Sequence, residues 1–343
     1  MASAAGRVAA LPRSRWGKLA LQLLVGVALI AALLALDPRR LLRLLAGADP
    51  LLVALVVALT FVYTFLLSER WRVILRGLGA PTRPWPAFDL TMRGYFFGTF
   101  LPSNAGGDVV KAYLIGRRGV PLVVAFLSAL LDRLAGLVAL AWVGGLAVWL
   151  APALADTLSR LFGLALLGVG VGVTVVIVLG PRLVAVLEPA ALRLAPAFAR
   201  APVAAAAAAV RGFGQRPLPF VVAAVLSIPL QLFYVAQVYL LMLALHAPVD
   251  VARLTWAVTW ATLAGALPIS FSGFGPRETA FAMTLGANDV GVAIGLLTGA
   301  MQVISGVPGG VTQLLSSAAP PLPAADAPAP LDGSTRSSGT PDG

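Results

Sequence analysis

Long apolar runs without a charged residue dominate this sequence, and they restrict the solvent in which the chain can fold. A helix needs about 20 apolar residues to cross the ~30 Å hydrocarbon layer of a bilayer. The chain is 59% apolar and only 11% charged, whereas soluble domains average about 45–50% and about 25%. We therefore expect an all-α, multi-pass integral membrane protein. Its charge-free runs occupy residues 19–36, 50–68, 134–155, 161–181, 217–249, 254–276 and the stretch from 290 onward.

Missing and rare residue types exclude several chemistries. The sequence has no cysteine and one histidine, His246, so disulfides, thiolate metal sites and His-based catalytic dyads are not expected. It also lacks a G-x-x-x-x-G-K-[ST] nucleotide loop. We expect no metal, no cofactor and no enzymatic activity. The net charge of +11 does not indicate nucleic-acid binding, because the cations flank the apolar runs, where the positive-inside rule places them.

Basic clusters predict the orientation of the chain. The clusters at 7–18, 70–93 and 182–216 are expected on the cytoplasmic side, which puts both termini in the cytoplasm and the protein in the plasma membrane. The first run is interpreted as an uncleaved span, with a signal peptide as the alternative. The stretch 182–216 predicts an interfacial helix or a helical linker. Three parts result: a cytoplasmic segment at 1–16, a transmembrane domain at 17–316, and a Pro/Ala/Ser/Gly-rich tail at 317–343 that is expected to be disordered.

Two segments cannot form uninterrupted spans. The first contains FFGTFLPSNAGGDVVKAYLIG at 96–116, where Pro102 and the Gly106–Gly107 pair interrupt the helix. The second contains LAGALPISFSGFGPRETAFAMTLG at 263–286, where prolines and glycines at 268–276 do the same. In both, a Leu-Pro pair precedes a small polar loop, a charged helix start and another apolar run. We interpret the two segments as an internal repeat.

Backbone groups freed at such breaks cannot be satisfied by lipid, so the breaks belong where protein or water reaches them. Each unit is therefore predicted to be a re-entrant helical hairpin, the first entering from the cytoplasmic face and the second from the opposite face. The predicted architecture is about six full transmembrane helices plus two oppositely oriented re-entrant hairpins. Inverted repeats of this kind place transport sites near the bilayer midplane. A pair of kinked full spans is the alternative.

Six ionisable residues lie within or beside these segments, and they need partners. A charge at the bilayer centre costs at least about 2.5–3.5 kcal/mol. Arg133 and Arg277 are predicted to pair with Asp108 and Glu278, while Lys111 faces Asp132. Asp108 and Lys111 are spaced i,i+3, so a local pair is the alternative. The six residues are Asp108, Lys111, Asp132, Arg133, Arg277 and Glu278.

The helix starts near Gly107 and Pro276 would add free N–H groups and partial positive charge. With the nearby cations they predict a site for an anionic group such as a lipid phosphate, and glycine would let that group approach the backbone. In the alternative, Asp108 caps its own helix and the arginines only close ion pairs. The candidate substrate-binding residues are Asn104, Gly106, Gly107, Asp108, Lys111, Asp132, Arg133, Ser272, Gly273, Gly275, Arg277 and Glu278.

Other polar positions are weaker candidates. Gln231, Tyr234 and Gln237 share one helix face, and they either line a path or bond across helices. Gln302 and Ser305 receive the same interpretation. The run 308–310 predicts a kink or close packing, and His246 is expected at the end of a span.

Five motifs together resemble the lysylphosphatidylglycerol synthase transmembrane-region family, whose members are also called flippase-like domain proteins. They are RWRVILRGLG, FFGTFLPSNAGGDVVKAYLIGR, LLDRLAGLVAL, PISFSGFGPRETAF and a closing VPGG. The resemblance covers residues 15–316 and extends to the family positions matched by Asn104, Gly106, Gly107, Asp108, Arg133, Gly273, Gly275, Arg277 and Glu278. Two positions depart from the family pattern: Asp132 stands where Glu is common, and Lys111 where Arg is frequent.

The resemblance implies a membrane domain that moves a phospholipid or lipid-linked substrate, with membrane lipids as partners. Fused family members carry a soluble domain that makes the lipid; no segment after 316 resembles one, so synthase activity is not expected here. A separate lipid-modifying or glycosyl-transferring enzyme is an expected partner. The alternatives are an ion-coupled solute transporter, an intramembrane enzyme, and a non-catalytic subunit that only presents lipid. The sequence does not indicate an oligomeric state.

Overall fold

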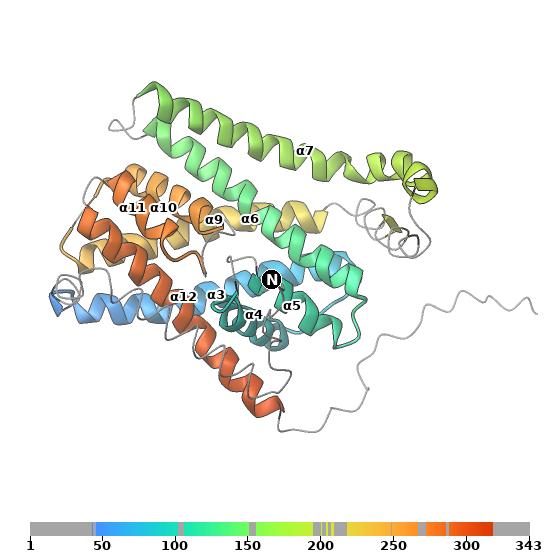
Figure 1. Cartoon of the computed structure of the whole chain (residues 1–343), viewed down its shortest axis with the longest axis horizontal. Helices are drawn as coiled ribbons and strands as arrows, with labels where there is room; N and C mark the ends of the chain where they lie inside the picture. Colours follow the sequence, from blue (N-terminus) through green and yellow to red (C-terminus); the bar gives the residue numbers. More distant parts are fainter. Residues whose placement is uncertain are drawn as a thin grey trace, which may run out of the picture.

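Helices form all the regular structure in the part of the chain that this computed structural model describes, so the predicted all-α class is confirmed (Figure 1). The described residues are 43, 46–101, 106–150, 156–194, 200, 204, 207–208, 218–247, 249–266, 272–285 and 288–317. The predicted first span, Asn104 and most of the predicted tail lie outside them. The helices are α3 (Pro50–Gly77), α4 (Pro84–Gly98), α5 (Gly106–Gly116), α6 (Leu122–Leu150), α7 (Thr157–Leu194), α9 (Leu218–Ala244), α10 (Val251–Ala266), α11 (Pro276–Leu285) and α12 (Asn288–Ser317).

Within the described residues, five stretches are long and apolar enough to cross a membrane, and they correspond to five of the predicted spans. They are Pro50–Gly77, Leu122–Leu150, Thr157–Val175, Leu218–Ala244 and Asp289–Leu315. At 1.5 Å per residue even the 19-residue stretch in α7 extends about 28 Å, close to the hydrocarbon thickness. The chain is therefore a multi-pass membrane protein.

Two helices extend beyond the boundaries that the apolar runs predict. The second run ends at residue 68, yet α3 continues to Gly77, and Arg70 is buried within it rather than in a loop. The fourth run ends at Pro181, yet α7 continues to Leu194 and takes in part of the predicted linker. A charged residue ends an apolar run but does not end a helix when its side chain finds a partner, which explains the error at α3.

The two predicted breaks are present, and each separates a pair of short helices. The pairs are α4 with α5, and α10 with α11, and the helices within each pair contact one another. They contain 15, 11, 16 and 10 residues, which is about 15 to 24 Å at 1.5 Å per residue. None is as long as the ~30 Å hydrocarbon layer. We call these pairs the first and second hairpins.

Glycines let the arms of the first hairpin pack backbone to backbone. A Cβ on Gly107 would lie 2.6 Å from the carbonyl oxygen of Gly94, and one on Gly98 would lie 3.0 Å from Gly107 Cα. No side chain fits at this crossing. Gly107 thus serves the contact between α4 and α5 in addition to its predicted role at the ligand site.

A long helix follows each hairpin, and each long helix packs on both hairpins. α6 contacts α5 of its own hairpin and α10 of the other, while α12 contacts α11 of its own hairpin and α4 of the other. Both crossings between hairpins are tight: a Cβ on Gly144 would overlap Thr259, and one on Gly309 would overlap the backbone of Arg93. The predicted close packing near residue 309 is therefore present.

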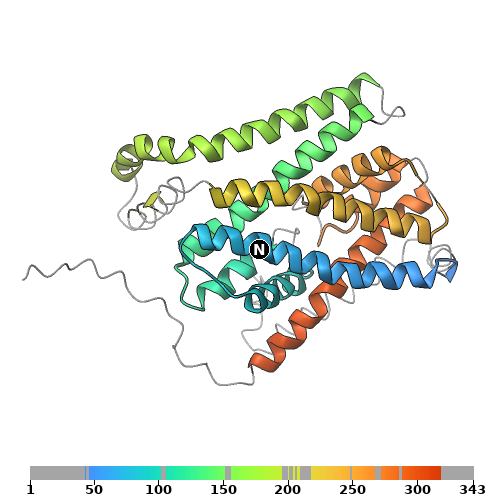
Figure 2. The same ribbon diagram turned by 180° about the vertical axis from the view of Figure 1, so that it is seen from behind.

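The remaining long helices frame this arrangement. α3 packs along α9, with stacked rings of Tyr63, Phe233 and Tyr234 at the contact. The start of α3 is fixed by Asp49, whose carboxylate accepts from Leu51 N at 2.8 Å and whose own N–H donates to the Ala244 carbonyl at 2.9 Å. α7 lies along one edge of the molecule beside α6 in both views (Figures 1 and 2).

Candidate functional site

The breaks of the two hairpins touch each other in the interior of the bundle. The backbone N–H of Ser272 donates to the carbonyl oxygen of Leu101 at 3.3 Å. The second break is sharply turned: Ser272, Gly273 and Gly275 have φ angles of 51°, 78° and 95°, a left-handed conformation that glycine adopts without steric cost. The sequence prediction that the two tips meet agrees with this contact.

A cavity of about 290 Å³ lies beside the tips. Residues from α3, α4, α5, α6, α9, α10, α11 and α12 line it, so both hairpins contribute to its walls. Among the predicted site residues, the lining includes Gly107, Asp108, Lys111, Asp132, Arg133 and Arg277. The other described candidates, Gly106, Ser272, Gly273, Gly275 and Glu278, shape the surrounding backbone and are not part of its lining.

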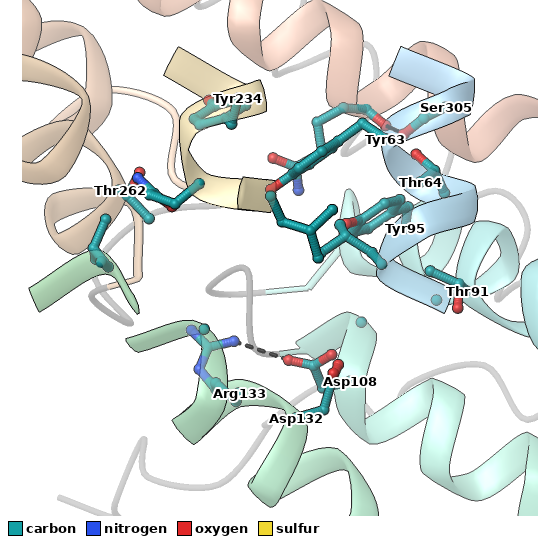
Figure 3. Close-up of a pocket in the computed structure, with 18 of the residues that line it drawn as sticks. Tyr63, Thr64, Thr91, Tyr95, Asp108, Asp132, Arg133, Tyr234, Thr262 and Ser305 are labelled. Carbon is teal, nitrogen blue, oxygen red and sulfur yellow. Dashed lines mark hydrogen bonds and ion pairs between the residues drawn. The ribbon is translucent and has the colours of Figure 1, made fainter. Parts of the chain in front are cut away.

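Five charged side chains form an ionic cluster in the wall of the cavity, and Figure 3 shows three of them, Asp108, Asp132 and Arg133. Arg133 Nη1 contacts Asp108 Oδ2 at 2.9 Å, and Lys111 Nζ contacts Asp132 Oδ2 at 3.1 Å. Both pairings are as the sequence predicts. Lys111 also lies 3.4 Å from Asp108 Oδ1, so the local alternative is formed as well. The cluster comprises Arg70, Asp108, Lys111, Asp132 and Arg133.

Arg70 is the member that the sequence prediction missed. Its Nε lies 2.8 Å from Asp132 Oδ1, and its Nη1 donates to Ser227 Oγ at 3.0 Å. A signal was available in α3, because Tyr63, Leu67 and Arg70 follow at i, i+4 and i+7 and all line the cavity. Reading the helix as ending at residue 68 removed Arg70 from that face.

Burial is graded across the cluster. The side chains of Arg70, Lys111 and Asp132 are 6–9% exposed, whereas those of Arg133 and Asp108 are 29% and 31% exposed. The Lys111 ammonium also lies 4.5 Å from the ring centroid of Trp71. Asp132 is therefore locked between two buried cations, and the Asp108–Arg133 pair is the part of the cluster that a solute can reach.

Arg277 and Glu278 do not form the ion pairs that the sequence predicts. Arg277 Nη2 donates to the Ser272 carbonyl at 2.7 Å and to Gln302 Oε1 at 3.1 Å. Glu278 accepts from the backbone N–H of Gly275, and no cation pairs with it among the described residues. Neighbouring residues on a helix point about 100° apart, so Arg277 faces the cavity while Glu278 packs against Gly295 of α12.

The weaker candidates also lie at the cavity. Gln231, Tyr234 and Gln237 line it from α9, and Gln302 and Ser305 line it from α12. Gln237 additionally donates to the Leu59 carbonyl at 3.2 Å, so it bonds across helices as well. His246 lies exposed at the end of α9, as expected.

Comparison with known proteins gives a family match and several partial relatives. A family model described as the lysylphosphatidylglycerol synthase TM region matches residues 19–311. A UPF0104 membrane protein of Methanothermobacter thermautotrophicus is 29% identical over 117 residues, covering 33% of this chain and 35% of that protein. Glycosyltransferase AglD of Haloferax volcanii is 31% identical over 132 residues, covering 36% and 20%.

A UPF0104 membrane protein of Methanocaldococcus jannaschii is 28% identical over 106 residues, covering 30% of this chain and 31% of that protein. The aligned stretches thus span 20% to 35% of the lengths of these three relatives. No solved structure matches the chain.

Proposed function

The chain belongs to the lysylphosphatidylglycerol synthase TM region family, and on this basis we propose that it is a flippase-like membrane translocase for a phospholipid or a lipid-linked substrate. One observation carries the proposal: a charged cavity lies where two broken hairpins meet inside an apolar helical bundle. Four cations and two carboxylates line it, which leaves a net charge of +2. Ionisable residues at membrane depth are costly and usually mark a substrate pathway.

The proposed topology has six full spans, with the run at 19–36 as the first, and two re-entrant hairpins that enter from opposite faces. The short arms support it, because none is long enough to cross the hydrocarbon layer. The reciprocal packing of α6 on α10 and α12 on α4 suits two repeats related by an axis in the membrane plane. Both termini are then cytoplasmic and the protein resides in the plasma membrane.

The cavity volume sets what can pass through it. About 290 Å³ is at the small end of ligand pockets, which span roughly 300–1,000 Å³. A headgroup fits this space, so the acyl chains remain in the surrounding lipid. The accessible Asp108–Arg133 pair exchanges partners with the headgroup, while the buried Asp132 cluster keeps its ion pairs. Movement of the hairpins exposes the cavity to one leaflet and then to the other, and the proposal includes no bond-making step.

A separate enzyme is the proposed partner. The glycosyltransferase relative aligns over only 20% of its own length, so in that protein the related region accompanies a much larger remainder. By analogy, this chain works beside a lipid-modifying or glycosyl-transferring enzyme that supplies or consumes its substrate.

Reconstitution in vesicles tests the proposal. Fluorescent anionic, zwitterionic and polyprenyl-phosphate lipids are placed in vesicles with and without the protein, and their crossing is followed by chemical quenching of the outer leaflet. Wild type should accelerate the crossing of at least one class, and Arg133→Gln should slow it about tenfold, since a charge-assisted contact contributes roughly 1.5–3 kcal/mol.

The matched control is Arg160→Gln, which removes one charge from an exposed residue of α7 outside the cavity. Vesicles that contain this variant should move lipids across the bilayer at the wild-type rate. The translocase would be refuted if all three lipid classes crossed no faster in vesicles with wild-type protein than in empty vesicles. Uptake of a soluble solute in the same vesicles would favour the ion-coupled transporter instead.

A further inference from the structure

We propose that Arg277 and Gln231 form a phosphate-binding subsite, separate from the ionic cluster, that holds the anionic group of the substrate. The inference rests on the proposed function and specifies where the substrate's charge binds. It locates the anion on the α9–α11 side of the cavity and assigns it to donors that the protein itself leaves unused.

Arg277 is a buried cation with an unused donor. The residue is 5% exposed, and its Nη2 is engaged by the Ser272 carbonyl and Gln302. Its Nη1 is buried and has no hydrogen-bond acceptor among the described residues. A buried donor without a partner costs about 1–3 kcal/mol, and more when the group is charged. A ligand acceptor in the cavity removes that cost.

Gln231 is a second unused donor in the wall of the same cavity. It is 9% exposed, and within the described part of the chain its Nε2 contacts no acceptor. Gln231 lies one helical turn before Tyr234 on α9. Tyr234 in turn lies close enough to Arg277 for the two groups to interact electrostatically. The two open donors therefore belong to neighbouring parts of the lining.

The charges that line the cavity favour an anion at this place, and Glu278, which pairs with no cation among the described residues, is not part of that lining. The carboxylates of the cavity, Asp108 and Asp132, already face Arg70, Lys111 and Arg133. Arg277 lies in the first turn of α11, where the helix N-terminus adds partial positive charge. Gly299 lets the guanidinium pack closely against α12, because a Cβ there would lie only 2.9 Å from Arg277 Nη1. Two N–H donors, one of them cationic, suit the oxygens of a phosphate monoester or diester.

Thermal unfolding of the purified full chain in detergent tests the subsite. Phosphatidic acid and diacylglycerol with the same acyl chains differ only in the phosphate, and inorganic phosphate supplies the group without a lipid. Phosphatidic acid should raise the Tm of the wild type and diacylglycerol should not. Arg277→Gln should weaken the apparent affinity for phosphatidic acid about tenfold or more, the loss of one charge-assisted contact. The charge-matched Arg160→Gln should leave it unchanged.

Gln231→Leu keeps the test decisive if Arg277→Gln fails to fold. It removes an unused donor, so the ligand-free Tm should be unchanged or higher while the affinity for phosphatidic acid falls. Equal stabilisation by diacylglycerol, or unchanged affinity in both variants, would overturn the subsite. Stabilisation by inorganic phosphate at the affinity of the lipid would support the subsite and assign it to a free anion.

The two proposals can fail separately. If both variants bind phosphatidic acid more weakly while vesicles with wild-type protein move no lipid, the subsite is supported and the translocase is refuted. If the wild type moves lipid and neither variant changes the affinity for phosphatidic acid, the translocase is supported and the subsite is refuted.

Discussion

At the residue scale, Asp132 is the carboxylate in the cavity that pairs with two buried cations. Its two oxygens face Arg70 at 2.8 Å and Lys111 at 3.1 Å, and its side chain is 8% exposed. Two buried cations therefore depend on one carboxylate. Removing one partner of a buried ion pair is costly because the remaining charge stays desolvated.

Asp132→Asn should consequently destabilise the protein strongly, by about 3–5 kcal/mol. Asp108→Asn provides the comparison, since Asp108 and its partner Arg133 are 31% and 29% exposed and Lys111 keeps its ion pair with Asp132. Thermal or denaturant unfolding in detergent should show that the Asp132→Asn variant is much less stable than the Asp108→Asn variant. Equal stabilities for the two variants would contradict the burial gradient across the cluster.

The sequence predicts part of this residue-level arrangement. The cost of isolated charges in lipid, together with helical spacing, favoured Asp108 with Arg133 and Lys111 with Asp132, and left open the local Asp108–Lys111 pair, which is also present. It was not enough for Arg277, which satisfies one nitrogen with a carbonyl and an amide instead of a carboxylate. Neutral acceptors leave no charge pattern in a sequence, so such partners become visible only in three dimensions.

At the element scale, the contact between α4 and α5 depends on the absence of side chains. A Cβ on Gly107 would lie 2.6 Å from the carbonyl oxygen of Gly94, and backbone cannot move aside as a flexible side chain can. The arms of the first hairpin must separate to admit even one methyl group. The walls of the cavity would then shift with them.

Gly107→Ala should therefore destabilise the fold by about 1–3 kcal/mol, the usual cost of overpacking. Gly168→Ala on α7 is the matched control, because no atom lies within 4 Å of its added Cβ and alanine favours helix over glycine. Unfolding in detergent should show a lower Tm for the first variant and an unchanged or higher Tm for the second. The same Tm for both would mean that the arms do not pack this closely.

Helix ends were harder to predict than helix breaks. Proline and glycine act through local backbone geometry, so the interruptions near residues 102 and 273 could be read from the sequence. The continuation of α3 to Gly77 depends on what its polar residues contact. Arg70, for example, is held inside the helix bundle by Asp132, a residue 62 positions away.

At the scale of the whole molecule, hydropathy predicted the five candidate spans of the described residues, but it did not predict how they pack. Lipid-facing and protein-facing helices are almost equally apolar, so sequence periodicity is a weak guide to neighbours. The position of α7 at the edge, beside α6 (Figure 2), and the contact between the tips of the hairpins had no separate sequence signal beyond the repeat itself.

The contact between the tips can be tested by a cross-link. The chain has no cysteine, so a Leu101→Cys, Ser272→Cys double variant contains only the designed pair. Ser272 N lies 3.3 Å from Leu101 O, so we expect the two residues to be close enough for a disulfide. Oxidation should link them, stop lipid crossing in vesicles, and be reversed by reductant. Each single variant should remain unaffected, and failure of the pair to oxidise would mean that the tips do not meet.

The reciprocal crossings of α6 and α12 also link the two hairpins mechanically. α12 is fastened to α4 as well as to α11, and α6 to α10 as well as to α5, with glycine contacts that leave no slack at Gly144 and Gly309. A tilt of either hairpin is therefore expected to move the long helix that follows the other hairpin. We therefore expect movement of one hairpin to be transmitted to the other through these two crossings.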